Sequence, residues 1–167
     1  MSGSKECRFP ESPSIDWSIP LIRQNGRQIL RVVIVSHEWY GFNTHFHDGR
    51  TIACVGPHEC LLHEKGVPTR WCGTLIVGKS GSRGFSLFPF TQAVLPELRS
   101  AFAEYGTLCG VVAEFGRRTG NVRSAMTCTI RQKRNWQGKV YTLSSVKRHT
   151  DRIFGAKGYG AREGSSS

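Results

Sequence analysis

The chain has 167 residues, enough for one domain with a buried core and terminal segments. Hydrophobic residues make up only 38% of it, so we expect part of the chain to be disordered or to wrap a partner. The start shows no apolar signal segment, and no run approaches the eighteen apolar residues of a membrane helix. We therefore expect a cytoplasmic protein with no membrane partner and with free cysteines rather than disulfides.

The formal net charge of +11 is unevenly distributed. Residues 114–167 carry twelve Lys and Arg against three Asp and Glu, whereas residues 1–113 carry eleven against nine. Such asymmetry indicates a polyanionic partner, most commonly nucleic acid. A basic segment that only keeps the protein soluble is the alternative.

The first third of the chain predicts an arm, a turn and a strand. Residues 1–20 hold three prolines among serines, which favours an extended N-terminal arm. Asn25-Gly26 marks a turn, and residues 28–36 are short, β-branched and almost continuously apolar. This pattern predicts a strand buried on both faces.

Residues 45–63 are unusually rich in metal-ligating side chains, with four histidines and two cysteines in nineteen residues. Cys60 and His63 form a C-x-x-H pair, whose two side chains can point at one centre on a tight turn. Structural zinc takes four Cys or His ligands at tetrahedral corners. We predict one structural zinc ion bound by Cys54, Cys60, His63 and either His45 or His47, with His45 favoured. The alternative is a histidine-rich surface loop with two free thiols.

The remaining segments predict four hairpin-forming strands, a helix and a further candidate strand. Strands are expected at 69–77 and 85–90, joined by a glycine-rich turn that lacks the full P-loop pattern. Apolar spacing after Thr91 predicts a helix that ends at Gly106, in which Pro96 must either lie in the first turn or kink the helix. Strands at 108–117 and 123–133 should form a hairpin with a basic tip, and 140–146 is a further candidate strand.

The order strand, long insertion, two strands, helix, two strands matches a five-stranded OB-like barrel with one helix between strands 3 and 4. The metal-binding segment would then be an insertion between strands 1 and 2. We divide the chain into an arm (1–20), the OB-like domain (21–146) and a basic flexible tail (147–167). An open α+β sheet is the alternative.

A His-Cys-Cys pattern with a fourth ligand, inserted near the first strands of such a barrel, resembles the zinc-bearing single-stranded-DNA-binding proteins of the T-even phages. By position, the resemblance implies His45, Cys54, Cys60 and His63 as ligands and cooperative binding of single strands without sequence preference. The likeness covers about a third of the chain, and it departs from that family at His63, which replaces a cysteine. The shorter spacings and the basic C-terminal end differ as well.

Binding of single strands requires cations for phosphates and aromatic faces for bases. We expect the zinc to shape one wall of a groove on strands 2 and 3, opposite the hairpin tip. The candidate nucleic-acid-binding residues are Arg50, Arg70, Trp71, Lys79, Arg83, Arg117, Arg118, Arg123, Lys133, Arg134 and Trp136. For each of them a solvated or packed role is the alternative.

The partner that we expect is single-stranded nucleic acid, with DNA favoured over RNA. We do not expect an enzyme, because the zinc deaminase pattern is incomplete and no cluster of carboxylates suggests a nuclease. The alternative to a single-stranded-DNA-binding protein is a subunit that binds RNA inside a larger nucleoprotein complex.

Overall fold

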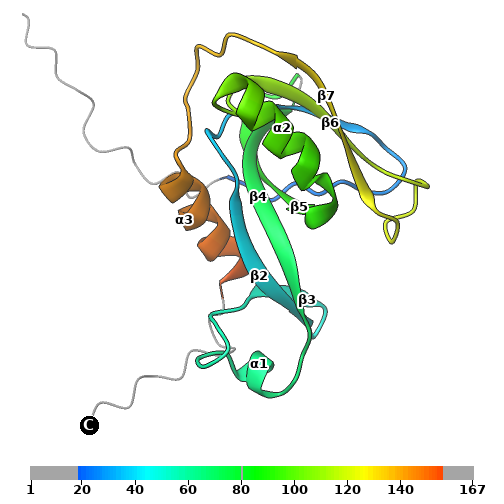
Figure 1. The fold of residues 1–167 in the computed structure, drawn as a ribbon, viewed down its shortest axis with the longest axis vertical. Helices are drawn as coiled ribbons and strands as arrows, with labels where there is room; N and C mark the ends of the chain where they lie inside the picture. The colour runs from blue at the N-terminus through cyan, green and yellow to red at the C-terminus, as the bar shows by residue number, and fades with distance from the viewer. Residues whose placement is uncertain (1–18, 80, 156–167) are drawn as a thin grey trace, which may run out of the picture.

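The computed structural model describes residues 19–79 and 81–155, which form a mainly β structure with helices on both faces of the sheet (Figure 1). The outer parts of the predicted arm and tail, 1–18 and 156–167, lie outside the described residues. The strands are β1 (Leu30–Ile34), β2 (Tyr40–His47), β3 (Arg50–Ala53), β4 (Thr69–Lys79), β5 (Phe85–Thr91), β6 (Val111–Arg117) and β7 (Met126–Lys133). The helices are α1 (Leu61–Glu64), the 3-10 helix η1 (Gln92–Val94), α2 (Leu95–Tyr105) and α3 (Leu143–Phe154).

Strand β4 is the centre of one antiparallel sheet. Along one edge it pairs first with β2 and then with β1, and along the other edge it pairs with β5. Strand β1 also pairs with β6, which pairs with β7, and β2 pairs with β3. The predicted antiparallel, mainly β fold is therefore confirmed, with β2 and β3 as strands that we did not predict.

The sheet is open, so the predicted closed barrel is not confirmed. Closure would require β5 to pair with β7, and no such pairing occurs within the described part of the chain. The chain leaves β5 at Thr91 and turns directly into η1 and α2, both of which contact β7. The outer edge of β5 is instead partly paired with the segment around Leu21, through a parallel bridge to Leu87, while η1 and α2 lie against β7.

Helix α2 covers one face of the sheet and confirms the predicted helix. Pro96 lies in its first turn, where no backbone N–H is missed, and Gly106 ends it with a left-handed φ of 72°. Its buried Leu98 packs into the core that contains Leu75 and Val77 of β4.

Helix α3 covers the other face, and here the sequence prediction was wrong. We expected a strand at 140–146 and a flexible tail from 147, but residues 143–154 form a helix. Val146, Thr150 and Phe154 recur every four residues and are buried against the sheet. Thr142 caps the helix by accepting a hydrogen bond from the Ser145 backbone N–H.

The cysteines of the described residues are all free. Burial raises the pKa of Cys72 to about 11 and that of Cys128 to about 12, so both thiols stay protonated near neutral pH. In the described ranges, no helix has both the length and the apolarity that crossing a membrane requires.

Candidate metal centre and nucleic-acid interface

Strands β2 and β3 form a hairpin that carries the metal-binding segment away from the rest of the sheet (Figure 1). The hairpin turns at Asp48-Gly49, where both residues have positive φ (49° and 72°). Asp-Gly at two positive φ angles is typical of the tight turns that join antiparallel strands. We call residues 40–68, which comprise this hairpin and the segment through α1, the flap.

The flap brings the four predicted ligands together. His45 is buried on β2, Cys54 follows β3, Cys60 precedes α1, and His63 lies within α1. The ligand atoms of His45, Cys54 and His63 all lie within 4.8 Å of one another. Cys60 Sγ is 3.4 Å from His45 Nε2, and Cys54 Sγ is 3.7 Å from His63 Nδ1. The structure therefore contains a His/Cys group that could hold a metal ion.

Hydrogen bonds fix the tautomer of His45. Its Nδ1 lies 3.0 Å from the Val67 carbonyl oxygen and 3.2 Å from that of Pro68. Carbonyl oxygens only accept, so Nδ1 carries the proton and Nε2 presents a lone pair to the cluster. A metal-ligating histidine commonly donates its other N–H to a carbonyl in this way. His47, in contrast, lies with Nε2 3.4 Å from an Asp48 carboxylate oxygen.

The Cys54 thiol is poorly stabilised as a thiolate by the protein alone. Desolvation raises the pKa of Cys54, and the adjacent Cys60 raises it further through a hydrogen bond and through charge, against a lowering by the Gly56 backbone N–H. Two neighbouring thiolates repel, and a cation between them removes that repulsion. Around the cluster, Ile52, Cys60 and Leu62 form only a very small apolar core.

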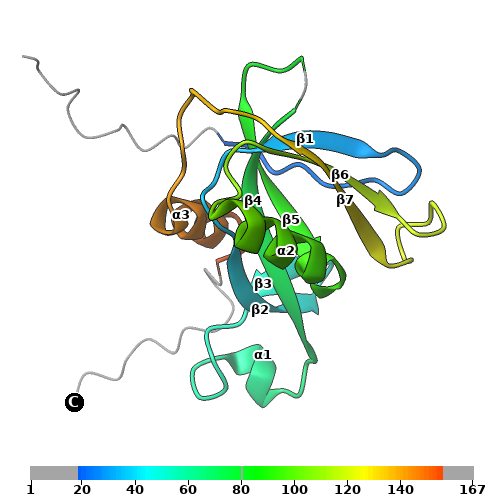
Figure 2. The same cartoon turned by 45° about the horizontal axis from the view of Figure 1, so that its top comes forward.

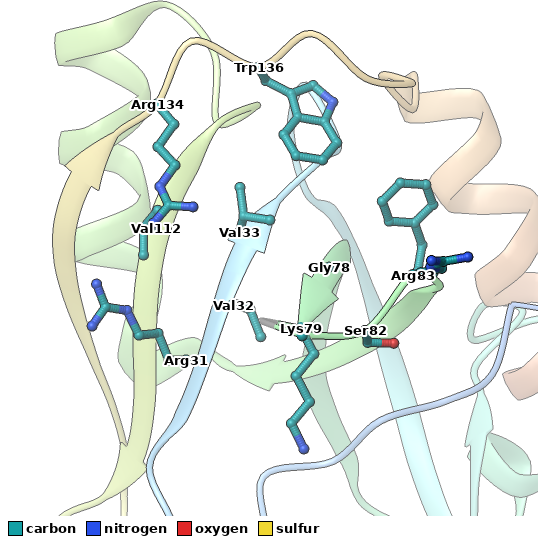
Figure 3. A pocket seen from close by; sticks show the side chains of 12 residues that line it. Arg31, Val32, Val33, Gly78, Lys79, Ser82, Arg83, Val112, Arg134 and Trp136 are labelled. Carbon is teal, nitrogen blue, oxygen red and sulfur yellow. The ribbon is translucent and has the colours of Figure 1, made fainter.

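Four of the candidate nucleic-acid-binding residues meet at the other end of β4, in a pocket of ≈ 320 Å³ (Figure 3). We call this the upper pocket. Figure 3 shows Arg31 and Arg134 on one side of it, Lys79 and Arg83 on the other, and Trp136 above Val33. Its lining residues are Arg31, Val32, Val33, Gly78, Lys79, Gly81, Ser82, Arg83, Phe85, Val112, Arg134 and Trp136.

The upper pocket has cationic side chains and no carboxylate in its lining. Among the described residues, Lys79, Arg83 and Arg134 have no ion pair, while Arg31 lies 3.7 Å from Glu114. Trp136 is half-buried, and its Nε1 donates a hydrogen bond to the Lys139 carbonyl oxygen (3.0 Å). The indole is thereby held in place at the pocket.

Three further candidates line a second pocket of ≈ 200 Å³, which lies between the flap strands and the loop end of the β6–β7 hairpin. Arg70 is exposed there, but Trp71 and Arg117 have structural roles. A Cβ on Gly41 or Gly73 would lie 2.7 Å from the Trp71 ring, so the indole packs directly on the sheet backbone.

Arg117 is held by the protein and is not free for phosphate. Its Nε donates to Gln24 Oε1 (3.1 Å) and its Nη1 to the Ser124 carbonyl oxygen (3.1 Å). Burial lowers its pKa, as desolvation disfavours the charged form.

The structure does not gather the remaining candidates into either pocket. Arg118 and Arg123 are exposed near the tip of the β6–β7 hairpin, and Arg50 is exposed on the flap. Lys133 is exposed beside the upper pocket, with its Nζ 3.4 Å from the Arg134 carbonyl oxygen. We did not single out Arg31, whose place in an apolar strand suggested burial, although alternation with the core residue Val32 could have indicated its exposure.

In comparisons with known proteins, no family model, no curated protein and no solved structure matches this chain. The resemblance to the phage proteins therefore stays an expectation. The function must be argued from the side chains that the fold brings together.

Proposed function

We propose that this protein binds single-stranded nucleic acid, with the upper pocket as the main contact and a structural zinc ion in the flap. The observation that supports the binding proposal is the composition of the upper pocket. Lys79 and Arg83 on the β4–β5 turn and Arg134 after β7 line one pocket and lack carboxylate partners in the described structure. A fold gains no stability from gathering like charges, so the arrangement suits an external polyanion.

The aromatic side chains at the pocket favour unpaired bases over a duplex. Phe85 and Trp136 line it with their rings 6.2 Å apart in an edge-to-face arrangement. Stacking of a base on an aromatic ring is worth roughly 1–3 kcal/mol and requires a base that is not already stacked in a helix. Stacking also tolerates any base, which suits binding without sequence preference.

The zinc proposal is supported by the distances between donor atoms. With Zn–S near 2.3 Å and Zn–N near 2.0–2.1 Å, tetrahedral geometry puts a sulfur and a nitrogen ligand about 3.5 Å apart. The two S···N distances in the flap, 3.4 Å and 3.7 Å, are close to this value. His45, Cys54, Cys60 and His63 would thus hold one ion, which supplies the cross-link that the small apolar core of the flap does not.

A binding titration tests the proposal. Fluorescence anisotropy with labelled single-stranded DNA, single-stranded RNA and duplex DNA at two salt concentrations should show single strands bound more tightly than duplex. Tighter binding of RNA than DNA would favour the subunit of a nucleoprotein complex. Recovery of intact oligonucleotide after incubation with Mg²⁺ is expected of a binding protein.

A charge-matched pair of variants locates the site. Arg134→Ala combined with Trp136→Ala should weaken single-strand binding and make its log–log salt dependence shallower by about 0.7 for the lost phosphate contact. Arg99→Ala, which removes an exposed charge from α2, should change neither. Equal effects of the two variants would show that the attraction is diffuse and would remove the upper pocket from the proposal.

A further inference from the structure

The upper pocket carries more positive charge than one internal nucleotide can neutralise. Four cationic side chains line a volume of ≈ 320 Å³, which is at the small end of the range for ligand pockets. Within residues 19–79 and 81–155, Arg31 alone of the four has a carboxylate nearby, and that carboxylate, on Glu114, also accepts two hydrogen bonds from Arg131 (2.7 and 2.9 Å). An internal phosphodiester brings one negative charge per nucleotide, whereas a phosphate monoester brings about −1.5 to −2 at pH 7.

We propose that the upper pocket recognises a nucleotide with a terminal phosphate, either the phosphorylated end of a single strand or a free nucleotide. The proposal rests on the proposed function and names the part of the ligand that the upper pocket recognises. The terminal phosphate supplies the extra charge, and the base occupies the aromatic part of the pocket.

The turn between β4 and β5 provides the donors for such a phosphate. Lys79, Ser82 and Arg83 are exposed on one side of the pocket within five positions of one another (Figure 3). The Ser82 hydroxyl oxygen accepts from the Gly84 N–H (3.4 Å), which leaves its proton free to donate. Gly81 has a φ of 79° and nothing within 4 Å of its Cβ position, so the turn is open to a ligand. A terminal phosphate has three oxygens that can accept from a cluster of this kind.

The floor of the pocket suits a base. Val33 and Val112 are paired neighbours on β1 and β6, and their side chains line the pocket together with Phe85 and Trp136. Apolar walls with a few polar groups at the rim are typical of sites for small organic ligands. A base against this floor places its phosphate at the rim, where the cations lie.

The test compares oligonucleotides whose ends differ only in a phosphate. Anisotropy titrations would use one short single-stranded DNA with a 5′-phosphate, with a 3′-phosphate, or with hydroxyls at both ends. Calorimetry with a nucleoside, its monophosphate and its triphosphate forms the free-ligand arm. We expect one phosphorylated end to improve affinity about tenfold over hydroxyl ends, the effect of one hydrogen bond to a charged group. We expect the triphosphate to bind more tightly than the monophosphate, and the nucleoside not at all.

Two double variants then test whether the β4–β5 turn causes the preference for phosphorylated ends. Lys79→Ala with Arg83→Ala should reduce the ratio of affinities for phosphorylated and hydroxyl ends to near one. Arg99→Ala with Arg148→Ala, which removes two exposed charges from α2 and α3, should keep the ratio. A ratio that survives in the first variant, or is lost in the second, would overturn the proposal.

The outcomes separate this inference from the function on which it rests. Equal affinity for phosphorylated and hydroxyl ends, without binding of free nucleotides, would overturn end recognition and leave single-strand binding intact. A strand that crosses the pocket with internal phosphates on both sides would give this result. Binding of free nucleotides without binding of any strand would support phosphate recognition by the upper pocket and overturn the proposed single-strand binding. If neither free nucleotides nor strands bind, both the inference and the proposed function are overturned.

Discussion

His45 and His47 lie two positions apart on β2 and therefore on the same side of the strand. Spacing alone left either one as the first ligand. The structure distinguishes them by their surroundings, because the His45 ring is fully buried with Nδ1 bonded to backbone carbonyls and Nε2 facing Cys60. His47 instead lies beside the Asp48 carboxylate near the turn.

This difference predicts the behaviour of two single substitutions. His45→Ala should abolish stoichiometric zinc binding, since it removes one of four ligands, whereas His47→Ala should retain one zinc per chain. Elemental analysis of the purified variants, combined with competition against a chromogenic chelator, measures both stoichiometry and affinity. Loss of zinc in the His47 variant with retention in the His45 variant would exchange their roles, and two metal-free variants would argue against a site defined by His45.

At the scale of elements, sequence patterns predicted those strands and helices whose signals are local. The strands β4 to β7 and helix α2 have apolar patterns in their own residues, and Asn25-Gly26 is a local turn signal. Asp48-Gly49 carries an equally local hairpin signal, but its flanking strands, with two histidines in β2 and only four residues in β3, lack the long apolar alternation that marks a strand. The convergence of the ligands depends on this hairpin.

Helix α3 was missed for a different reason. Its buried positions include Thr150 and His149, which are polar, and its exposed positions are basic, so the segment resembled a solvated tail. The helix depends on tertiary contacts, such as the 2.6 Å hydrogen bond between Thr150 Oγ1 and Thr74 Oγ1 of β4. Such contacts can be inferred only when it is known which face of the sheet no other element covers. The open sheet was missed likewise, because the sequence does not show that the segment around Leu21 pairs with β5 or that α2 packs against β7.

Because α3 covers a core face, we expect it to contribute to global stability. Phe154 is 3% exposed and packs in the apolar cluster of α3 with Val146 and Tyr141. Phe154→Ala should lower the free energy of unfolding by about 3 kcal/mol, the usual lower cost of removing a buried phenylalanine side chain. Leu143→Ala, at a position 39% exposed at the start of the same helix, should cost much less.

Urea unfolding followed by far-UV circular dichroism measures both α3 variants. A loss of less than about 0.5 kcal/mol in the Phe154 variant, the range usual for surface substitutions, would mean that α3 is not docked on the sheet in solution. The equal slope of both unfolding curves would show that the two variants unfold the same amount of surface.

At the scale of the whole molecule, β4 separates the two unusual sites. It begins at Thr69, just after the flap, and ends at Lys79 on the rim of the upper pocket. Figure 2 shows the flap with α1 at one end of the molecule and the β4–β5 turn at the other. Eleven residues of strand span roughly 35 Å, so the metal site is not a wall of the upper pocket. The flap adjoins the second pocket instead, through Thr44 and Thr51.

This separation predicts that metal removal affects binding in a length-dependent way. Chelation should loosen the flap, since its small apolar core cannot replace four ligands, while the sheet stays folded around its own two clusters. Hydrogen exchange should therefore rise in the outer part of the flap, residues 48–68, and remain unchanged in β5 and β6. A short oligonucleotide that fills only the upper pocket should bind as before, because that pocket contains no flap residue. A longer strand that also reaches Arg70, beside the flap, should bind more weakly without zinc.

Titrations with oligonucleotides of increasing length, with and without chelator, measure this length dependence directly. Equal weakening at every length would show that the metal supports the whole fold, and no weakening at any length would confine nucleic acid to the far end of β4.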